Sequence, residues 1–334
     1  MKILRTFPAV TNGPTAAPCA LAIGNFDGVH RGHQALLQEL VQTAQAKGLV
    51  PAVLTFEPHP RDFFASQKSS SPEAERTPRI QPLRDKLLAL AACGVQATFV
   101  LRFDPAMASQ PAERFVRQVL AGALQVRHLV LGDDFRFGAG RAGDVALLRR
   151  LGAELDFAVQ TLADVDDGGR RISSTALRTA LLAGDMAQAQ TLLGQPYALD
   201  GRVRHGQKLG RTLGFPTLNQ RLALRPPGTP TAARGIFVSR VHQLVPGQPQ
   251  RVLAGVSSLG TRPTLGEGLE PWLETHVLDW PRELGPEGGY GRHIRVELLA
   301  HLHFERRYAG LAELQAGIAA DLEDARRWHA EHPV

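Results

Sequence analysis

Two histidines lie three residues apart in the glycine-rich segment GNFDGVHRGH (residues 24–33), which directly follows the apolar run CALAI. Such a pair could bind a metal, relay a proton, or belong to an ordinary polar loop. A metal site is disfavoured, because no third ligand stands at a useful spacing from His30 and His33. If the segment joins a strand to a helix, the N–H groups at the helix start favour an anion. The segment therefore predicts phosphate binding by both histidines, since imidazole can donate to a phosphate oxygen.

The segment RISSTALR (residues 171–178) offers a second set of phosphate-binding groups. Hydroxyls and N–H groups at a helix start can hold a phosphate, and arginines add fixed positive charge. For the hydroxyls, an ordinary helix N-cap is the alternative. The candidate residues are Arg171, Ser173, Ser174, Thr175 and Arg178.

Two oxygen-bearing side chains, Thr217 and Asn219, stand two residues apart after Pro216 in HGQKLGRTLGFPTLN. In an extended segment they would face the same way and could present two oxygens to Mg²⁺. The alternative is that both are turn residues. The segment is not a Walker A loop, because GxxxxGK[ST] occurs nowhere in the chain.

A carboxylate and an imidazole alternate with other side chains in WLETHVLDW. In a strand, Glu274 and His276 would share one face, and Leu273, Thr275 and Val277 would take the other. Glu274 would then be a carboxylate facing a cleft. A solvated strand face is the alternative.

Between residue 19 and about residue 161, short β-type runs alternate with helical patterns. This alternation predicts a doubly wound α/β sheet of parallel strands, in which ligands bind at the carboxyl ends of the strands. The predicted strands are CALAI, AVLTF, ATFVL, HLVLG and FAVQT, and the predicted helices are QALLQELVQTAQAKG, PLRDKLLALAACG, PAERFVRQVLAGA and GDVALLRRLG. Residues 138–143, GAGRAG, satisfy GxGxxG but do not follow the first strand, so we interpret them as a flexible turn.

After residue 193 the pattern changes to β-type segments separated by glycine and proline, which predicts a small antiparallel barrel or sandwich. An amphipathic helix at about residues 311–328 closes the chain, and a helical stretch at 174–193 joins the two domains. We therefore expect one domain at residues 1–184 and a second at residues 185–334.

The polar segment FASQKSSSPEAERTPRI, which contains residues 65–80, predicts a mobile loop or lid, with plain disorder as the alternative. The net charge of +6 is spread over both halves without a basic block, which favours small anionic partners over nucleic acid. Cys19 and Cys93 stand in apolar stretches without a CxxC, so we expect reduced core cysteines. We find neither an export signal nor a membrane span, which makes the cytoplasm the expected location.

Several segments together resemble one family. The histidine segment is similar to the signature of the HxGH nucleotidyltransferases, and GNFDGVHRGHQ followed by TFEPHPRDFF resembles the bifunctional riboflavin kinase/FMN adenylyltransferases, the prokaryotic FAD synthetases. GDDFRFG (residues 132–138) and RISSTALR resemble later adenylyltransferase motifs of that family, and GFPTLN with ETH resembles its kinase module. The resemblance implies that the C-terminal barrel converts riboflavin and ATP to FMN and ADP. It also implies that the N-terminal domain converts FMN and ATP to FAD and pyrophosphate, with Mg²⁺ accompanying ATP.

The resemblance further implies roles for single residues. The catalytic groups would be His30, His33 and the proton-accepting Glu274. In the adenylyltransferase site, the nucleotide would be bound by Gly24, Phe26, Asp27, His30, His33, Asp134, Arg171, Ser173, Ser174, Thr175 and Arg178, and the flavin by Pro58, Pro60 and Phe64. In the kinase site, ATP would be bound by Gly206, Lys208, Gly210, Thr217 and Asn219, and the last two would also contact Mg²⁺.

Two other classes of function remain open on the sequence. The first is a flavin-binding or regulatory protein that keeps the fold and has lost one or both activities; the intact HxGH, Thr217, Asn219 and Glu274 argue against it. The second is an RNA-binding protein that uses the basic surface, for which binding should collapse with salt and ignore flavin.

Overall fold

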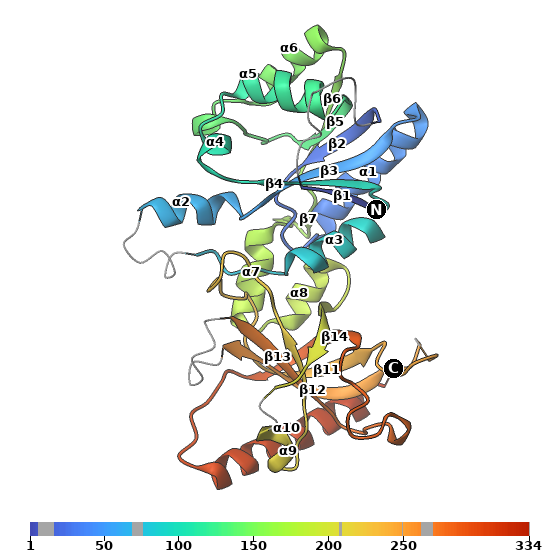
Figure 1. The fold of residues 1–334 in the computed structure, drawn as a ribbon, viewed down its shortest axis with the longest axis vertical. Helices are drawn as coiled ribbons and strands as arrows, with labels where there is room; N and C mark the ends of the chain where they lie inside the picture. Colours follow the sequence, from blue (N-terminus) through green and yellow to red (C-terminus); the bar gives the residue numbers. More distant parts are fainter. Residues whose placement is uncertain (6–16, 69–75, 207–208, 249, 262–269, 334) are drawn as a thin grey trace. The chain divides into compact units, whose positions relative to one another are not determined.

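The chain folds into two compact units in the computed structural model, which describes residues 1–333 except for 6–16, 69–75, 207–208, 249 and 262–269 (Figure 1). The first unit comprises Met1–Thr77 and Lys86–Ser173. The second comprises Pro78–Asp85 and Ser174–Val334.

The first unit is built on a six-stranded sheet with the order β1-β4-β3-β2-β5-β6, in which every neighbouring pair is parallel. The predicted doubly wound α/β sheet is therefore confirmed. The strands are β1 (Lys2–Leu4), β2 (Cys19–Ile23), β3 (Val50–Glu57), β4 (Ala97–Arg102), β5 (Val126–Gly132) and β6 (Ala158–Leu162). Every residue of β2 is buried, as an apolar run in the middle of a parallel sheet requires.

Helices cover both faces of this sheet. On one face, Leu37, Leu40 and Ala44 of α1 (Arg31–Lys47) and Leu90 of α3 (Leu83–Ala92) form a core with strand residues. On the other face lie α5 (Ala112–Arg114), its π-helical continuation η1 (Phe115–Ala123), and α6 (Val145–Leu155). Helix α1 ends at Gly48, the predicted stop, whose left-handed backbone (φ +64°) suits glycine.

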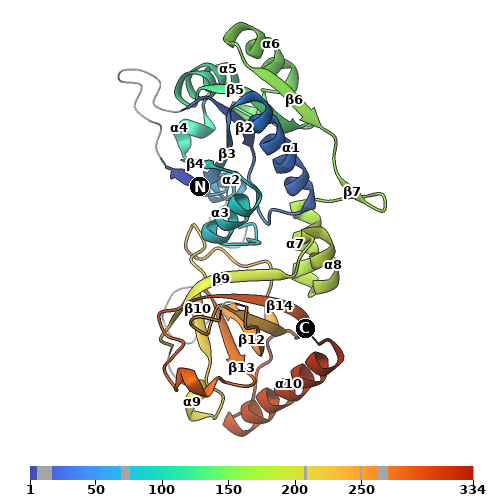
Figure 2. The ribbon, with the colours of Figure 1, turned by 90° about the vertical axis from the view of Figure 1, so that its right-hand side faces the viewer.

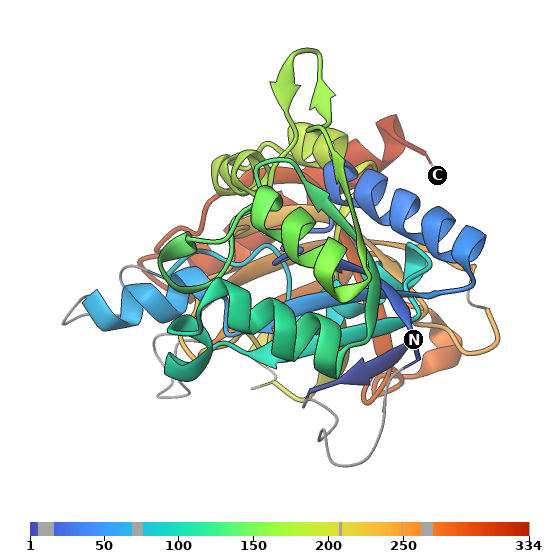
Figure 3. The same cartoon turned by 90° about the horizontal axis from the view of Figure 1, so that it is seen from above.

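Two smaller features differ from the prediction or were absent from it. The first residues of the predicted polar loop continue a helix, α2 (Pro60–Lys68), in which Phe63 and Phe64 pack on the ring of Phe103. Residues 69–75 of that loop lie outside the described residues. A short hairpin of β7 (Asp166–Asp167) and β8 (Arg170–Arg171) stands out from its unit (Figures 2 and 3).

The first and last glycines of GAGRAG serve packing, and the segment forms a turn as predicted. It contains the short helix η2 (Ala139–Arg141), and Phe137 and Gly143 form an isolated antiparallel bridge around it. A Cβ on Gly138 would lie 2.7 Å from the Cα of Ala112. Glycine at this position therefore lets the turn press against the start of α5.

The second unit is a closed antiparallel barrel with the strand order β10-β13-β12-β11-β14-β9, which decides between the barrel and the sandwich. Its strands are β9 (Tyr197–Arg204), β10 (Leu218–Arg221), β11 (Gly235–His242), β12 (Leu253–Thr261), β13 (Pro271–Val277) and β14 (His293–His303). Helix α10 (Leu311–Glu331) packs Leu322 and Ala325 on the outside of β11 and β12 (Figure 2).

Other helices of this unit are α7 (Ser174–Ala183), α8 (Met186–Leu193), the single turn α9 (Leu209–Thr212) and η4 (Arg282–Leu284). The segment Pro78–Asp85 also packs here, and the Tyr197 hydroxyl donates to the carbonyl of Ile80 over 2.6 Å. Within the described parts of the chain, no helix has the length and apolar character that crossing a membrane requires.

Candidate active sites

The histidine segment forms a tight turn between the carboxyl end of β2 and the start of α1, as predicted. Phe26 (φ +50°), Gly28 (φ +93°) and Val29 (φ +37°) all adopt the left-handed region of backbone conformation. Such conformations are strained for Phe and Val, and strained backbone clusters at ligand-binding and catalytic sites. The turn delivers His30 as the N-cap of α1, so the N–H groups of the first helical turn surround the histidine pair.

The two imidazoles stack on each other with ring centroids 3.7 Å apart and an interplanar angle of 18°. The backbone N–H of His33 donates to Nδ1 of His30 over 3.3 Å. Because Nδ1 accepts a hydrogen bond, neutral His30 carries its proton on Nε2. His30 therefore has a fixed tautomer, and its Nε2–H is the group that can donate to a ligand.

Burial keeps both histidines neutral near pH 7. The pKa of His30 is lowered to about 4, mainly by burial; among the smaller influences, Asp27 raises this pKa and Arg171 lowers it. The pKa of His33 is held well below its ordinary value by burial, by His30 and by Lys86. In the free protein both imidazoles are thus neutral and can act as hydrogen-bond donors.

Asp134 and Arg171, two predicted nucleotide-binding residues, lie together in the first unit. Arg171 in β8 contacts Asp134 over 2.8 Å and Asp164 over 2.9 Å. Its hydrogen bond to Asp134 is the main reason that the pKa of its guanidinium is raised. A Cβ on Gly32 would lie 3.5 Å from the carbonyl oxygen of Ile172, so the segment after β8 runs close to the start of α1.

The remaining residues of RISSTALR begin α7. Ser173 is the last residue of the first unit, and Ser174, Thr175 and Arg178 belong to the second. Nε of Arg178 donates to the carbonyl of Pro78 over 2.7 Å. The predicted helix start at the serines is confirmed, and their binding of a nucleotide stays a prediction.

An aromatic cluster occupies the carboxyl ends of β3 and β4, close to the residues predicted to bind the flavin. Pro58 follows β3, Pro60 begins α2, and Phe64 leaves 45% of its surface exposed. The ring of Phe64 lies 5.3 Å from that of Phe63 and 5.8 Å from that of Phe103. Phe63 and Phe103 were not among the residues predicted to bind the flavin, although TFEPHPRDFF contains Phe63.

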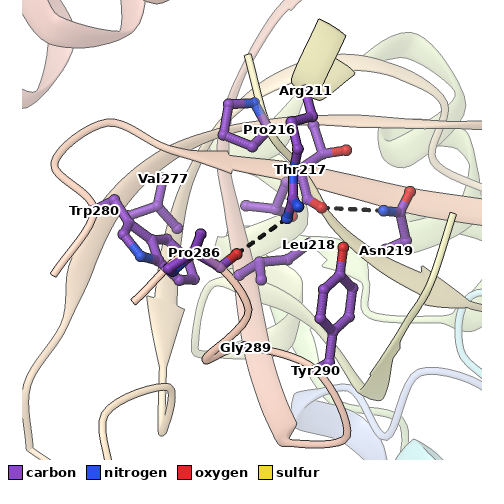
Figure 4. A pocket seen from close by; sticks show the side chains of 11 residues that line it. Arg211, Pro216, Thr217, Leu218, Asn219, Val277, Trp280, Pro286, Gly289 and Tyr290 are labelled. Atoms are coloured by element: carbon purple, nitrogen blue, oxygen red, sulfur yellow. Dashed lines mark hydrogen bonds between the residues drawn. The ribbon is translucent and has the colours of Figure 1, made fainter. Parts of the chain in front are cut away.

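A cavity of about 330 Å³ is lined by residues of β10 and β13 and of the loops beside them (Figure 4). Its lining contains the predicted pair Thr217 and Asn219, and the Asn219 amide donates to the backbone carbonyl of Thr217 over 3.0 Å. The other lining residues are Arg211, Pro216, Leu218, Thr275, Val277, Trp280, Pro286, Gly289 and Tyr290. The cavity thus joins an aromatic and aliphatic wall to a small set of polar groups, the usual composition of a ligand site.

Two predicted glycines allow the segment before β10 to fold onto this polar end. A Cβ on Gly206 would lie 2.8 Å from Cγ of Asn219, and one on Gly210 would collide with the carbonyl oxygen of Phe215. Any larger residue at either position would therefore overlap with its neighbour. Lys208, the other predicted residue of the segment, lies outside the described residues.

Glu274 lies next to Asn219 across the sheet. Partly buried Glu274 and His276 alternate with buried Leu273, Thr275 and Val277, so the predicted alternation is confirmed. Glu274 pairs with Asn219 on β10 and with Ser258 on β12, and residues paired in this way point to the same face. Glu274 is not part of the cavity lining, and it lies on the face of β13 opposite to Thr275 and Val277, which do line the cavity.

Glu274 has an acidic neighbour, Glu305, and the next residue but one, His276, makes a hydrogen bond that holds its strand. Burial raises the pKa of Glu305, Arg234 lowers it, and the Glu274 carboxylate raises it further. Nδ1 of His276 lies 2.8 Å from the carbonyl oxygen of Pro216, so this nitrogen carries a proton and donates. His276 thereby ties β13 to the residue directly before Thr217.

Among the described residues, no group of three or more His, Cys, Asp or Glu side chains could hold a metal ion. The side-chain oxygens of Thr217 and Asn219 are hard ligands of the kind that Mg²⁺ takes. Two such ligands fit a cation that a nucleotide carries, since Mg²⁺ usually keeps several waters and binds substrate phosphates.

Family models match both halves of the chain: FAD synthetase at residues 13–176 and riboflavin kinase at residues 193–329. The chain is 43% identical to the bifunctional riboflavin kinase/FMN adenylyltransferase of Escherichia coli strain K12 over 98% of both chains. It is 35% identical to the Bacillus subtilis protein of the same name over 93% of each.

A solved structure titled as a macrolide-efflux protein from Streptococcus pneumoniae superposes with a TM-score of 0.74 at 26% identity, covering 98% of this chain and all of that one. The two-domain fold is thus shared along the whole length. The sites described above, the matches to both family models and the identity to relatives over nearly the full length agree. The chain belongs to the family of bifunctional riboflavin kinase/FMN adenylyltransferases.

Proposed function

We propose that the two activities of this family reside in the two sites described above. The protein phosphorylates riboflavin to FMN with ATP, and it adenylylates FMN with a second ATP to give FAD and pyrophosphate. The histidine turn would serve the second reaction and the barrel cavity the first. The observation that supports this assignment is the register pairing of Asn219 with Glu274, since the proposed Mg²⁺ ligand and the proposed base are then neighbours across two strands.

In adenylyl transfer, the FMN phosphate attacks the α-phosphorus of ATP in line, and pyrophosphate leaves. Catalysis then consists of positioning and of stabilising the charge on the phosphate oxygens. His30 Nε2–H, His33 and the N–H groups of α1 would donate to these oxygens, and the neutral state of both imidazoles leaves the donors intact. The exposed ring of Phe64 would pack against the flavin.

Arg171 would change partners when ATP binds. Its charge is balanced by Asp134 and Asp164 in the free protein. A nucleotide phosphate would replace one of these carboxylates, because a charge-assisted pair of arginine with phosphate is among the stronger polar contacts. Ser173, Ser174, Thr175 and Arg178 remain the proposed further contacts to the nucleotide.

In the kinase site, Leu218, Val277 and Trp280 would line the nucleobase and ribose end of the cavity. Thr217 and Asn219 would hold the Mg²⁺ that accompanies ATP, and the ion would neutralise charge on the phosphates. Glu274 would accept the proton of the ribityl hydroxyl as that oxygen attacks the γ-phosphorus. Gly206 and Gly210 would let the segment before β10 approach the phosphates.

The direct test is chromatography of the purified protein with riboflavin and excess MgATP. FMN should appear first and FAD should follow it, with ADP and pyrophosphate as the second products. FMN without FAD, or no flavin product at all, would contradict the assignment of both activities to this chain.

Small molecules are the partners that both activities require. Residues 1–184 and 185–334 remain our proposed functional halves, because each contains one of the two sites. The cytoplasmic location and the lack of a nucleic-acid partner also stay predictions. Both cysteines are free in the structure, which is compatible with a reducing compartment.

A further inference from the structure

Arg211 connects two chain segments that both line the barrel cavity. It belongs to α9, before β10, and its Nη1 donates to Oε1 of Glu287 over 2.5 Å. Its Nη2 donates to the carbonyl oxygen of Pro286 over 3.0 Å (Figure 4). The side chains of Arg211 and Glu287 are 38% and 50% exposed, so this bridge lies on the solvent side of the cavity.

Both ends of the bridge are turns that are closed by their own hydrogen bonds. On one side, the N–H of Phe215 donates to the carbonyl of Gly210 over 2.7 Å. On the other side, the Trp280 indole donates to the carbonyl of Gly285 over 2.9 Å, and the N–H of Tyr290 donates to the carbonyl of Glu287 over 3.2 Å. The hydrogen bonds from the Arg211 guanidinium to Glu287 and Pro286 can therefore break while both turns stay folded.

We propose that Arg211, Pro286 and Glu287 form a clasp whose opening limits the exchange of nucleotide at the kinase site. The proposal rests on the placement of ATP in this cavity. A nucleotide held against Trp280 and Tyr290 leaves only after the two turns separate, and the ion pair opposes that separation. An exposed ion pair is weak and sensitive to salt, so the clasp slows exchange without preventing it.

Release of an N-methylanthraniloyl-labelled ADP, followed in a stopped-flow instrument, measures this step directly. The signal is energy transfer from tryptophan, and the chain has three tryptophans, of which Trp280 lines the cavity. Trp280→Phe should remove most of the signal and so confirm where the label binds. No energy transfer in the parent protein would refute the nucleotide site itself, and the clasp with it.

Glu287→Gln keeps the size of the side chain and removes the ion pair, so release should accelerate about 2- to 5-fold, the effect available to an exposed pair. Glu283→Gln is the matched control, because Glu283 lies in the same loop but pairs with Arg251. It should release the label at the parent rate. A Glu287→Gln protein that also releases at the parent rate would overturn the clasp.

A charge swap separates the clasp from direct contact of Arg211 with phosphate. Arg211→Glu and Glu287→Arg should each speed release. The double variant should recover part of the slow release, because the ion pair is rebuilt with reversed charges while the hydrogen bond to the Pro286 carbonyl stays lost. High salt should speed release from the parent more than from Glu287→Gln. Failure of the double variant to recover would show that Arg211 acts on the nucleotide instead and would overturn the clasp.

Discussion

Replacing His30 tests the environment of the histidine pair through the pH dependence of stability. His30 is 5% exposed, and burial lowers its pKa from 6.5 to about 4. Above pH 6.5 the imidazole is neutral in both the folded and the unfolded chain, so it has no effect on the pH dependence there. Between pH 6.5 and 4 the unfolded chain binds a proton that the folded chain does not, and the folded state loses stability as pH falls.

The size of the effect follows from the pKa shift. Each pH unit in this window costs roughly 1.4 kcal/mol for one such group. From pH 6.5 to pH 5 the loss attributable to His30 is therefore about 2 kcal/mol of unfolding free energy, and the full loss near pH 4 is about 3 kcal/mol.

His30→Asn removes the titrating group and keeps the cap. The Asn side-chain oxygen can accept from the N–H of His33 as Nδ1 does, and Asn is a good N-cap residue. Urea unfolding followed by circular dichroism at pH 7 and pH 5 should show the variant losing about 2 kcal/mol less than the parent on acidification. Equal losses in the two proteins would refute the buried, neutral state of His30.

Three further predictions concern catalysis. His33→Ala should reduce FAD formation from FMN by at least about 100-fold, as for loss of a transition-state donor, while FMN formation persists; loss of both activities in a folded variant would argue against separate sites. Glu274→Gln should slow riboflavin phosphorylation by roughly 10²–10⁴-fold with riboflavin binding retained, and a parent-like rate would exclude Glu274 as the base. Replacing Thr217 and Asn219 together by Ala should impair MgATP use in the kinase step alone, and a matching defect in FAD formation from FMN would contradict their placement.

The main elements could be predicted because their signals are local. The all-apolar run CALAI became the fully buried β2, and the alternation in WLETHVLDW became the two faces of β13. The histidine turn was found from its glycines and its position between a strand and a helix. Its strained backbone at Phe26 and Val29 was not, since nothing in the local pattern requires left-handed conformation from those two residues.

The parts that could not be predicted depend on contacts between distant segments. Arg211, Trp280 and Tyr290 meet in one cavity only after the barrel closes, and each alone is an ordinary residue near a turn. The edge strand Lys2–Leu4 is too short to show a periodic pattern. The segment Pro78–Asp85 joins the second unit through contacts such as that of Ile80 with Tyr197, which lies more than a hundred residues away.

The central claim, that one chain holds two independent sites, is tested most directly by mixing two variants that each lack one of the two activities. The His33→Ala protein should make FMN from riboflavin but no FAD, and the Glu274→Gln protein should make FAD only when FMN is supplied. Mixed with riboflavin and MgATP, the two should together make FAD, because FMN released by the first is adenylylated by the second. A mixture that makes FMN but no FAD, although the second variant still converts added FMN, would contradict the account.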